Sequence, residues 1–363
     1  MPDEPLAIAD TPEKLTPEWL TDALSRSGHL DGLRVVEAHV HPVGTGQVCD
    51  SYRIAMTFNG PTPTPSSLVA KLPGADPTSR ATSQMLRHYE KEVGFYRELA
   101  STLTMRTPRP YYADVDPGAN TFVLLLEDMA PAQQGDQLAG CTPEVAELAV
   151  RELVGLHAPR WGDPALHELE WLAGGDVESG MQMATMMLPM LWQGFQERYA
   201  SVLDHHVLDA GRQLFAHLDG YLTPDEEPVT VIHGDYRLDN LLLDPDPLGV
   251  PIATVDWQTC TLGGGARDVG YFVGAGLLEH DRREAEDGLL RMYRDGLVAA
   301  GVDHYSDTRA QRDYRMGAWT GLMIAIGASM MVERTDRGDE MFMVMASRHS
   351  RHALDLDAVE VLR

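Results

Sequence analysis

The order of apolar and polar positions divides the chain into a strand-rich N-terminal third and a helical remainder. Within the N-terminal third, residues 82–103 have helical spacing, and the Thr16-Pro17 pair predicts the start of a helix before the first strand. Segments with a two-residue period or a short apolar run predict strands at residues 33–40, 48–58, 67–72 and 121–127. This third is therefore expected to be a small sheet with an internal helix.

From Thr142 onward the pattern is mainly helical. Two short apolar segments, 241–243 and 252–255, interrupt it and predict a hairpin joined by a turn rich in Asp, Pro and Gly. Residues 316–332 form the most apolar stretch, but they barely reach the length of a membrane span and contain three glycines. We interpret this stretch as a buried core helix.

Charge and cysteine content narrow the possible functions. The 363 residues include 29 Lys and Arg against 55 Asp and Glu, a formal net charge of −26. A chain with so few cations is not expected to bind nucleic acid or an anionic membrane surface. The three cysteines are far apart and form no C-x-x-C pair, which argues against a disulfide framework or a structural zinc site and favours the reducing cytoplasm.

The segment 231–240 concentrates the chemistry of the chain. It places a histidine, Asp235, an arginine and Asn240 between apolar runs, where polar groups are costly unless they are paired or bind something. The predicted hairpin should return Asp256 to the neighbourhood of Asn240. One carboxylate and one amide oxygen suit Mg²⁺, which leaves Asp235 to orient or deprotonate an attacking hydroxyl in phosphoryl transfer.

Three motifs carry a family resemblance. They are HGDYRLDNLLLD at residues 233–244, VDWQ at 255–258 and ARDVG at 266–270. Together they resemble the aminoglycoside phosphotransferase and choline-kinase-like superfamily, distant relatives of protein kinases. The full strings are most similar to the branch that holds ecdysteroid-kinase-like proteins and the kinase-like domains fused to some acyl-CoA dehydrogenases.

The resemblance implies an α+β, two-lobed protein-kinase-like fold. Residues 1–127 would form a nucleotide-binding N-lobe with an antiparallel sheet plus helix. Residues 128–134 would be the hinge, and residues 135–363 a mainly helical C-lobe with the catalytic loop and the substrate pocket. ATP and Mg²⁺ would occupy the cleft of such a fold.

The resemblance also assigns roles to single residues. Asp235 would be the catalytic aspartate, and Asn240 and Asp256 the magnesium ligands. The residues implied for nucleotide binding are Lys71, Glu92, Gly44, Gly46, Glu127 and Met129. In this scheme a glutamate holds the lysine ammonium against the phosphates, the glycines cover the phosphates, and backbone groups from 127 to 129 read adenine.

Some further residues, in the motifs and in a methionine-rich segment, have more than one interpretation. His233 is more easily explained as a structural residue of the loop than as a proton carrier. Asp268 is expected to cap the following helix or brace the catalytic loop rather than to bind metal. Arg237 and Asp239 could contact substrate or pair within the loop. The five methionines between residues 181 and 190 recur partly at helical spacing, which is typical of a core, although methionines also line adaptable pockets.

The expected function is that of a small-molecule kinase, a phosphotransferase with an alcohol group as acceptor and ATP and Mg²⁺ as cofactors. The alternative is a catalytically silent nucleotide-binding scaffold of the same fold. A protein kinase is disfavoured, because only about ten residues separate Asp256 from the next helix. The acceptor stays open among aminoglycosides, choline-like cations, sterol-like alcohols and hydroxyacyl compounds, as do the choice between ATP and GTP and the oligomeric state.

Overall fold

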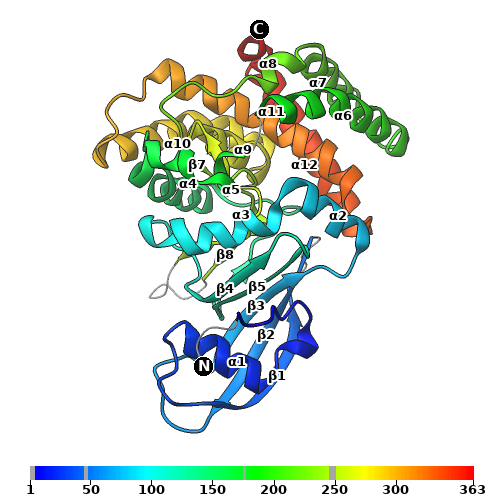
Figure 1. Ribbon diagram of the computed structural model, residues 1–363. Helices are drawn as coiled ribbons and strands as arrows, with labels where there is room; N and C mark the ends of the chain where they lie inside the picture. The colour runs from blue at the N-terminus through cyan, green and yellow to red at the C-terminus, as the bar shows by residue number, and fades with distance from the viewer. Residues whose placement is uncertain (1–4, 45–47, 175–176, 245–250) are drawn as a thin grey trace. The chain divides into compact units, whose positions relative to one another are not determined.

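The computed structural model describes residues 5–44, 48–174, 177–244 and 251–363 (Figure 1). Chain contacts divide it into two compact units. The first comprises Met1–Ser101 with Thr107–Pro131, and the second Thr102–Arg106 with Ala132–Arg363. The first contains a sheet and the second is mainly helical, so the α+β class is confirmed. The division after Pro131 falls within the segment expected to be a hinge, and a hinge role for that segment stays a prediction.

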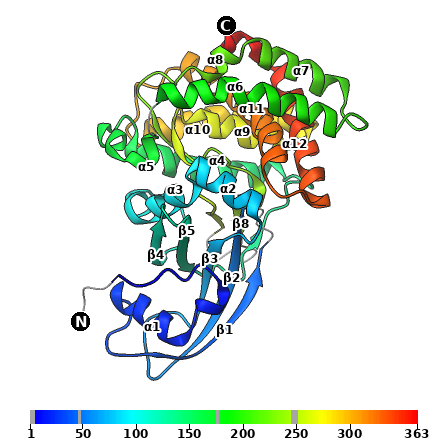
Figure 2. The same cartoon turned by 45° about the vertical axis from the view of Figure 1, so that its right-hand side comes forward.

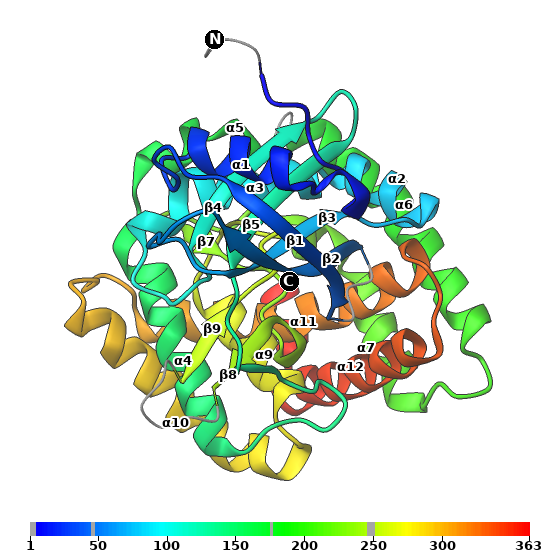
Figure 3. The same cartoon turned by 90° about the horizontal axis from the view of Figure 1, so that it is seen from below.

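The first unit is built on a five-stranded antiparallel sheet in the order β1-β2-β3-β5-β4. Its strands are β1 (Val35–Val43), β2 (Cys49–Phe58), β3 (Ser67–Pro73), β4 (Pro110–Asp116) and β5 (Thr121–Glu127). Helix α1 (Pro17–Arg26) lies against the sheet (Figure 3), and Leu20 and Leu24 are buried in the core between them. As the sequence indicated, Thr16 caps this helix by accepting a hydrogen bond from the Trp19 backbone N–H at 3.2 Å.

Two sequence predictions in this unit need correction. The helix expected over residues 82–103 is broken at Arg87, whose φ of 57° is left-handed. The segment instead forms α2 (Pro77–Leu86), α3 (His88–Gly94) and a π-helical turn over Phe95–Leu99. Strand β4 was not predicted, because it lies at the sheet edge, begins with a proline and is mostly half-buried, so it lacks an apolar run.

The second unit packs helices around two very small sheets. The helices are α4 (Pro143–His157), α5 (Glu170–Ala173), α6 (Val177–Arg198), α7 (His205–Ala216), α8 (Leu218–Leu222), α9 (Ala266–Gly276), α10 (Glu279–Ala299), α11 (Asp307–Met331) and α12 (Asp336–Asp355). The strands, ordered β6-β8-β9 and β10-β7, are β6 (Gln133–Gln134), β7 (Thr230–Ile232), β8 (Leu241–Leu243), β9 (Ile252–Thr254) and β10 (Thr261–Gly263). Short 3-10 turns lie at Pro12–Lys14, Ala100–Thr102, Ala158–Arg160, Pro164–Glu168, Leu238–Asn240 and Ala358–Leu362.

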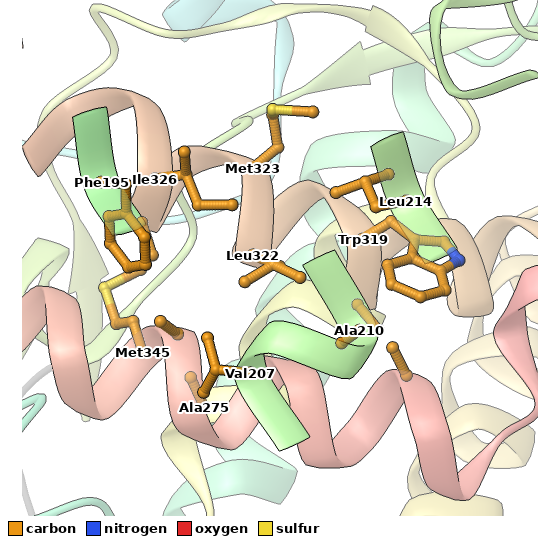
Figure 4. Close-up of a cluster of buried hydrophobic side chains, with 14 of the residues drawn as sticks. Phe195, Val207, Ala210, Leu214, Ala275, Trp319, Leu322, Met323, Ile326 and Met345 are labelled. Carbon is orange, nitrogen blue, oxygen red and sulfur yellow. The ribbon is translucent and has the colours of Figure 1, made fainter. Parts of the chain in front are cut away.

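Helix α11 forms the centre of the helical core. Its Trp319, Leu322 and Ile326 are fully buried among side chains of α6, α7 and α12 (Figure 4). This confirms the core helix expected from the apolar stretch. Among the described residues, none of the helices combines the length and the apolarity that crossing a bilayer requires.

Helix α6 lies alongside α11 (Figure 2) and turns only one face to the core. Trp192 and Phe195 occupy that face, whereas Met186 and Met190 are 69% and 72% exposed. The core position expected for the methionine-rich segment is therefore wrong for these residues. A helix needs only one apolar stripe, and the two aromatic residues already provide it.

Two glycines allow α9 and α11 to cross closely. A Cβ at Gly317 would collide with the Arg267 carbonyl oxygen, and one at Gly270 would collide with the Tyr314 carbonyl oxygen. The two backbones are therefore in direct contact, and the crossing fixes where the side chains of α9 point.

We expect Gly317→Ala to lower the free energy of unfolding by about 2 kcal/mol or more, because the new methyl group forces the two backbones apart. Gly327→Ala is the matched control on the same helix. A Cβ there meets nothing within 4 Å, so the higher helix propensity of alanine should stabilise the protein by up to about 1 kcal/mol. Urea unfolding measures both variants, and an equal effect of the two would contradict the packing argument.

The buried His349 predicts an acid-sensitive fold. It is 0% exposed, and neither ring nitrogen has a hydrogen-bond partner among the described residues. Burial, with His352 and two arginines nearby, lowers the pKa of His349 well below its ordinary value of 6.5. Below pH 6.5, and down to that lowered pKa, the unfolded chain binds a proton that the folded chain does not. Stability therefore falls as the pH decreases through this window.

His349→Leu should flatten the decline of the melting temperature between pH 6.5 and about pH 5. His304→Gln is the control, since the His304 side chain is 91% exposed and should leave the slope unchanged. Thermal unfolding followed by circular dichroism tests both variants. An unchanged slope in the leucine variant would show that other groups cause the acid sensitivity.

Candidate active site

The loop after β7 carries the motif HGD, and its shape depends on a glycine. Strand β7 pairs with β10, and the chain then turns at Gly234, whose φ is 80°. A Cβ at this position would lie 2.7 Å from the Thr259 carbonyl oxygen and would force the loop away. The glycine therefore brings the next residue, Asp235, out of the turn in a fixed direction.

Asp268, in the first turn of α9, holds the backbone of this loop by hydrogen bonds. Its Oδ2 accepts a hydrogen bond from the His233 backbone N–H at 2.6 Å, and its Oδ1 accepts one from the Gly234 N–H at 3.0 Å. His157 Nε2 lies 3.3 Å from Asp268 Oδ2, and the other ring nitrogen contacts the Tyr293 hydroxyl at 2.7 Å. Of the two interpretations of Asp268, bracing the loop is the one that the structure supports.

The His233 side chain has a structural role. Its Nε2 lies 3.0 Å from the Val255 carbonyl oxygen, and its Nδ1 lies 3.3 Å from the Asp235 backbone N–H. These contacts assign the proton to Nε2. The ring also packs against buried Trp257, with centroids 4.6 Å apart. The histidine thus joins the HGD loop to the end of β9.

Asp235 is 13% exposed, and three side chains donate hydrogen bonds to its carboxylate. The Tyr271 hydroxyl donates to Oδ1, while Arg237 Nε and Asn240 Nδ2 donate to Oδ2 at 3.1 and 3.0 Å. Arg237 also donates to Asp239 Oδ2 at 2.8 Å. The interpretation of Arg237 and Asp239 as a pair within the loop is therefore supported by contacts.

The hairpin β8–β9 brings the two expected magnesium ligands together. Leu241 faces Thr254 across the hairpin, and the Val255 N–H donates to the Asn240 carbonyl oxygen at 3.0 Å. The next residue, Asp256, has a φ of 69°, a left-handed conformation that is unusual outside glycine. Asp256 therefore lies beside Asn240, as the hairpin predicted.

The oxygen donors of this hairpin fit a hard cation. The Asn240 amide nitrogen donates to the Asp235 carbonyl oxygen and carboxylate, which fixes the side chain. Its Oδ1 accepts no hydrogen bond among the described residues, so a lone pair is available for a metal ion. One such amide oxygen and one carboxylate, with water and phosphate oxygens, match the preference of Mg²⁺.

In the first unit, Lys71 and Glu92 form a buried ion pair. Lys71 lies on β3 between β2 and β5, and its Nζ is 2.7 Å from Glu92 Oε1 on α3. The two side chains are 12% and 1% exposed. Glu90, two residues earlier on the same helix, pairs with Arg87 at 2.7 Å. The contact matches the expected pairing, while a role for it in nucleotide binding stays a prediction.

The other residues expected to bind nucleotide are placed less completely. Gly44 has a φ of 81° at the end of β1, while Gly46 lies outside the described residues. At the end of β5, the Glu127 N–H donates to the Arg109 carbonyl oxygen at 2.9 Å, so this N–H is already engaged. Met129 follows two residues later. Their roles toward adenine stay predictions.

One contact of the site was not predicted, namely that of Tyr271 with Asp235. The sequence did contain a signal for it. Tyr271 is three residues after Asp268 on α9, and residues three apart share one face of a helix. Once Asp268 is known to brace the loop, the same face must turn Tyr271 toward it.

The family model described as "Phosphotransferase enzyme family" matches residues 63–310, more than half of the chain. The chain belongs to this family. The expected family and the expectation of an enzyme, a phosphotransferase, are thereby confirmed.

Individual relatives agree on the fold. The solved microcompartment-associated aminopropanol kinase is 14% identical, with a TM-score of 0.55 over 95% of this chain and 99% of that one. The ethanolamine kinase of Plasmodium vivax is 12% identical, with a TM-score of 0.55 over 93% and 89%. These likenesses confirm the two-lobed, kinase-like fold.

A curated relative matches over a much shorter stretch. The acyl-CoA dehydrogenase family member 10 of Mus musculus is 44% identical over 48 residues. This match covers 13% of the chain and 4% of that protein.

The buried pair predicts an asymmetry between two neighbouring glutamates of α3. Glu92→Gln removes the carboxylate charge that lies 2.7 Å from the Lys71 ammonium and should cost about 3 kcal/mol of folding stability. Glu90→Gln removes only a partly exposed pair with Arg87 and should cost less than about 1 kcal/mol. Urea unfolding compares the two, and equal losses would show that the Lys71–Glu92 pair is not specifically stabilising.

Proposed function

We propose that the protein is a kinase that transfers the γ-phosphoryl group of ATP to a hydroxyl group of a small molecule in a Mg²⁺-dependent reaction. The observation that carries the proposal is the geometry around Asp235. Its carboxylate is partly accessible and is fixed by three hydrogen-bond donors. One of these donors is Asn240, which lies in the same hairpin as Asp256. Phosphoryl transfer needs an orienting carboxylate next to metal-binding oxygens.

Asp235 would accept a hydrogen bond from the acceptor hydroxyl and align its oxygen with the γ-phosphorus. As the bond from phosphorus to the departing ADP breaks and the new oxygen–phosphorus bond forms, the hydroxyl proton would pass to Asp235. Asn240 Oδ1 and the Asp256 carboxylate would hold Mg²⁺, which supplies neutralisation of the phosphate charge. Lys71, kept in place by Glu92, would present its ammonium to the α- and β-phosphates.

The net charge and the named relatives both bear on which class of acceptor the protein uses. The net charge of −26 favours cationic amino alcohols over anions during encounter, and two solved neighbours are an aminopropanol kinase and an ethanolamine kinase. The local match to an acyl-CoA dehydrogenase family member supports hydroxyacyl compounds instead. We place amino alcohols first and hydroxyacyl compounds second, and nucleotide preference and oligomeric state are left to experiment.

The test is Mg²⁺-dependent release of the nucleoside diphosphate by the purified full chain. It is challenged with aminopropanol, ethanolamine, choline, aminoglycosides, sterols and hydroxyacyl-CoA compounds, and run with both ATP and GTP. One acceptor class should stimulate turnover, and EDTA should abolish it. Asp235→Asn should lower kcat at least about 100-fold, whereas Asp209→Asn, on the exposed face of α7, should match the parent protein.

Three results would contradict the proposal. If Asp235→Asn kept its turnover, Asp235 would not be the catalytic group. If the protein bound ATP with Mg²⁺ but the whole panel gave no phosphorylated product, the silent nucleotide-binding scaffold would be favoured. Phosphorylation of added proteins and of no small molecule would favour a protein kinase.

A further inference from the structure

The hydrogen bonds to Asp235 restrict how an acceptor can approach it. An ionised carboxylate has about four lone-pair directions. Among the described residues, Arg237 and Asn240 occupy both directions of Oδ2, and the Tyr271 hydroxyl occupies one direction of Oδ1. A single direction on Oδ1 therefore remains for a hydroxyl group from outside.

Tyr271 is held rigidly in its place. Its side chain is 2% exposed, and its ring packs against His349 with centroids 5.2 Å apart. The close crossing of α9 with α11 at Gly270 and Gly317 fixes the backbone on which it stands. Three residues earlier on the same helix, Asp268 binds the backbone of the HGD loop. One helix thus contacts the catalytic loop at its backbone and at its reactive side chain.

We propose that Tyr271 is a positioning residue, whose hydroxyl holds Oδ1 of Asp235 so that the acceptor hydroxyl meets the carboxylate from one direction only. This inference rests on the proposed function of Asp235. It assigns to α9 a part in the reaction that neither the family match nor the HGD motif describes.

Two features of the site support this role over simple core packing. A buried tyrosine hydroxyl needs a hydrogen-bond partner, but a backbone carbonyl would serve, as it does for Tyr236. The partner of the Tyr271 hydroxyl is instead the carboxylate of Asp235, the proposed catalytic group. Burial, together with the nearby Asp235 charge, raises the pKa of Tyr271 well above its ordinary value of 10.0. The hydroxyl therefore stays protonated and remains a donor at every working pH.

The chain offers a matched control one residue after Asp235. Tyr236 is 0% exposed, and its hydroxyl donates to the Ala149 carbonyl oxygen at 2.8 Å. Tyr236→Phe and Tyr271→Phe each remove one buried hydroxyl and keep the ring. Only Tyr271→Phe changes the hydrogen bonds of Asp235.

The first measurement needs no acceptor. In protein labelled with ¹³C at aspartate carboxyl carbons, the Asp235 signal is identified by its loss in Asp235→Asn and is compared between variants at one neutral pH. Losing a hydrogen-bond donor should change the chemical shift of this signal in Tyr271→Phe. Tyr236→Phe should leave the signal where the parent protein has it.

The second measurement is turnover with Mg²⁺·ATP, using the best acceptor of the panel or water alone. Tyr271→Phe should lower kcat about 10-fold and change the KM for ATP less than about twofold, because the nucleotide contacts are untouched. Tyr236→Phe should keep the parent kcat and KM.

The outcomes separate this inference from the proposed function. An Asp235 ¹³C signal in Tyr271→Phe equal to that of the parent protein overturns the positioning role, and so does an equal loss of kcat in both phenylalanine variants. Full turnover by Asp235→Asn overturns the proposed function itself. If neither an acceptor nor water supports turnover, the ¹³C signal alone decides whether Tyr271 holds Asp235.

Discussion

The carboxylate of Asp268 is the contact on which the candidate site depends. It is 1% exposed, a position at which an unpaired charge would be strongly destabilising. Two backbone N–H groups of the HGD loop satisfy it, and His157 adds a third contact. Because the loop and the carboxylate need each other's hydrogen bonds, neither can move alone. The direction of Asp235 is therefore set by α9 rather than by the loop's own preferences.

Helix α9 can act in this way because of what packs against it. Glycines at its contact with α11 remove the side chains that would separate the two backbones. Helix α11 is itself fixed by the buried side chains of α6, α7 and α12 (Figure 4). The apolar core thus fixes α11, the backbone contact with α11 fixes α9, and α9 fixes the HGD loop. Precise sites are best supported by such regular elements.

The elements that depend on a local hydrophobic period or a turn were mostly predicted from the sequence. The hairpin that brings Asn240 and Asp256 together follows from two apolar segments and a turn, whereas the Lys71–Glu92 contact was implied by the family resemblance. The break at Arg87 and the edge strand β4 were missed, because neither depends on a hydrophobic period. Tyr271 required knowing which face of α9 meets the loop, and this depends on helix packing far along the chain.

Three donors hold the Asp235 carboxylate in one orientation. For most proton abstractions orientation alone would not be enough, because the base must also take the proton early. Phosphoryl transfer differs, because its loose transition state develops little negative charge on the attacking oxygen and the proton can leave late. What the reaction needs first is an acceptor oxygen aligned with the phosphorus, and good orientation alone can accelerate a reaction by large factors. The hydrogen bonds around Asp235 supply that orientation, and this suits phosphoryl transfer to an alcohol.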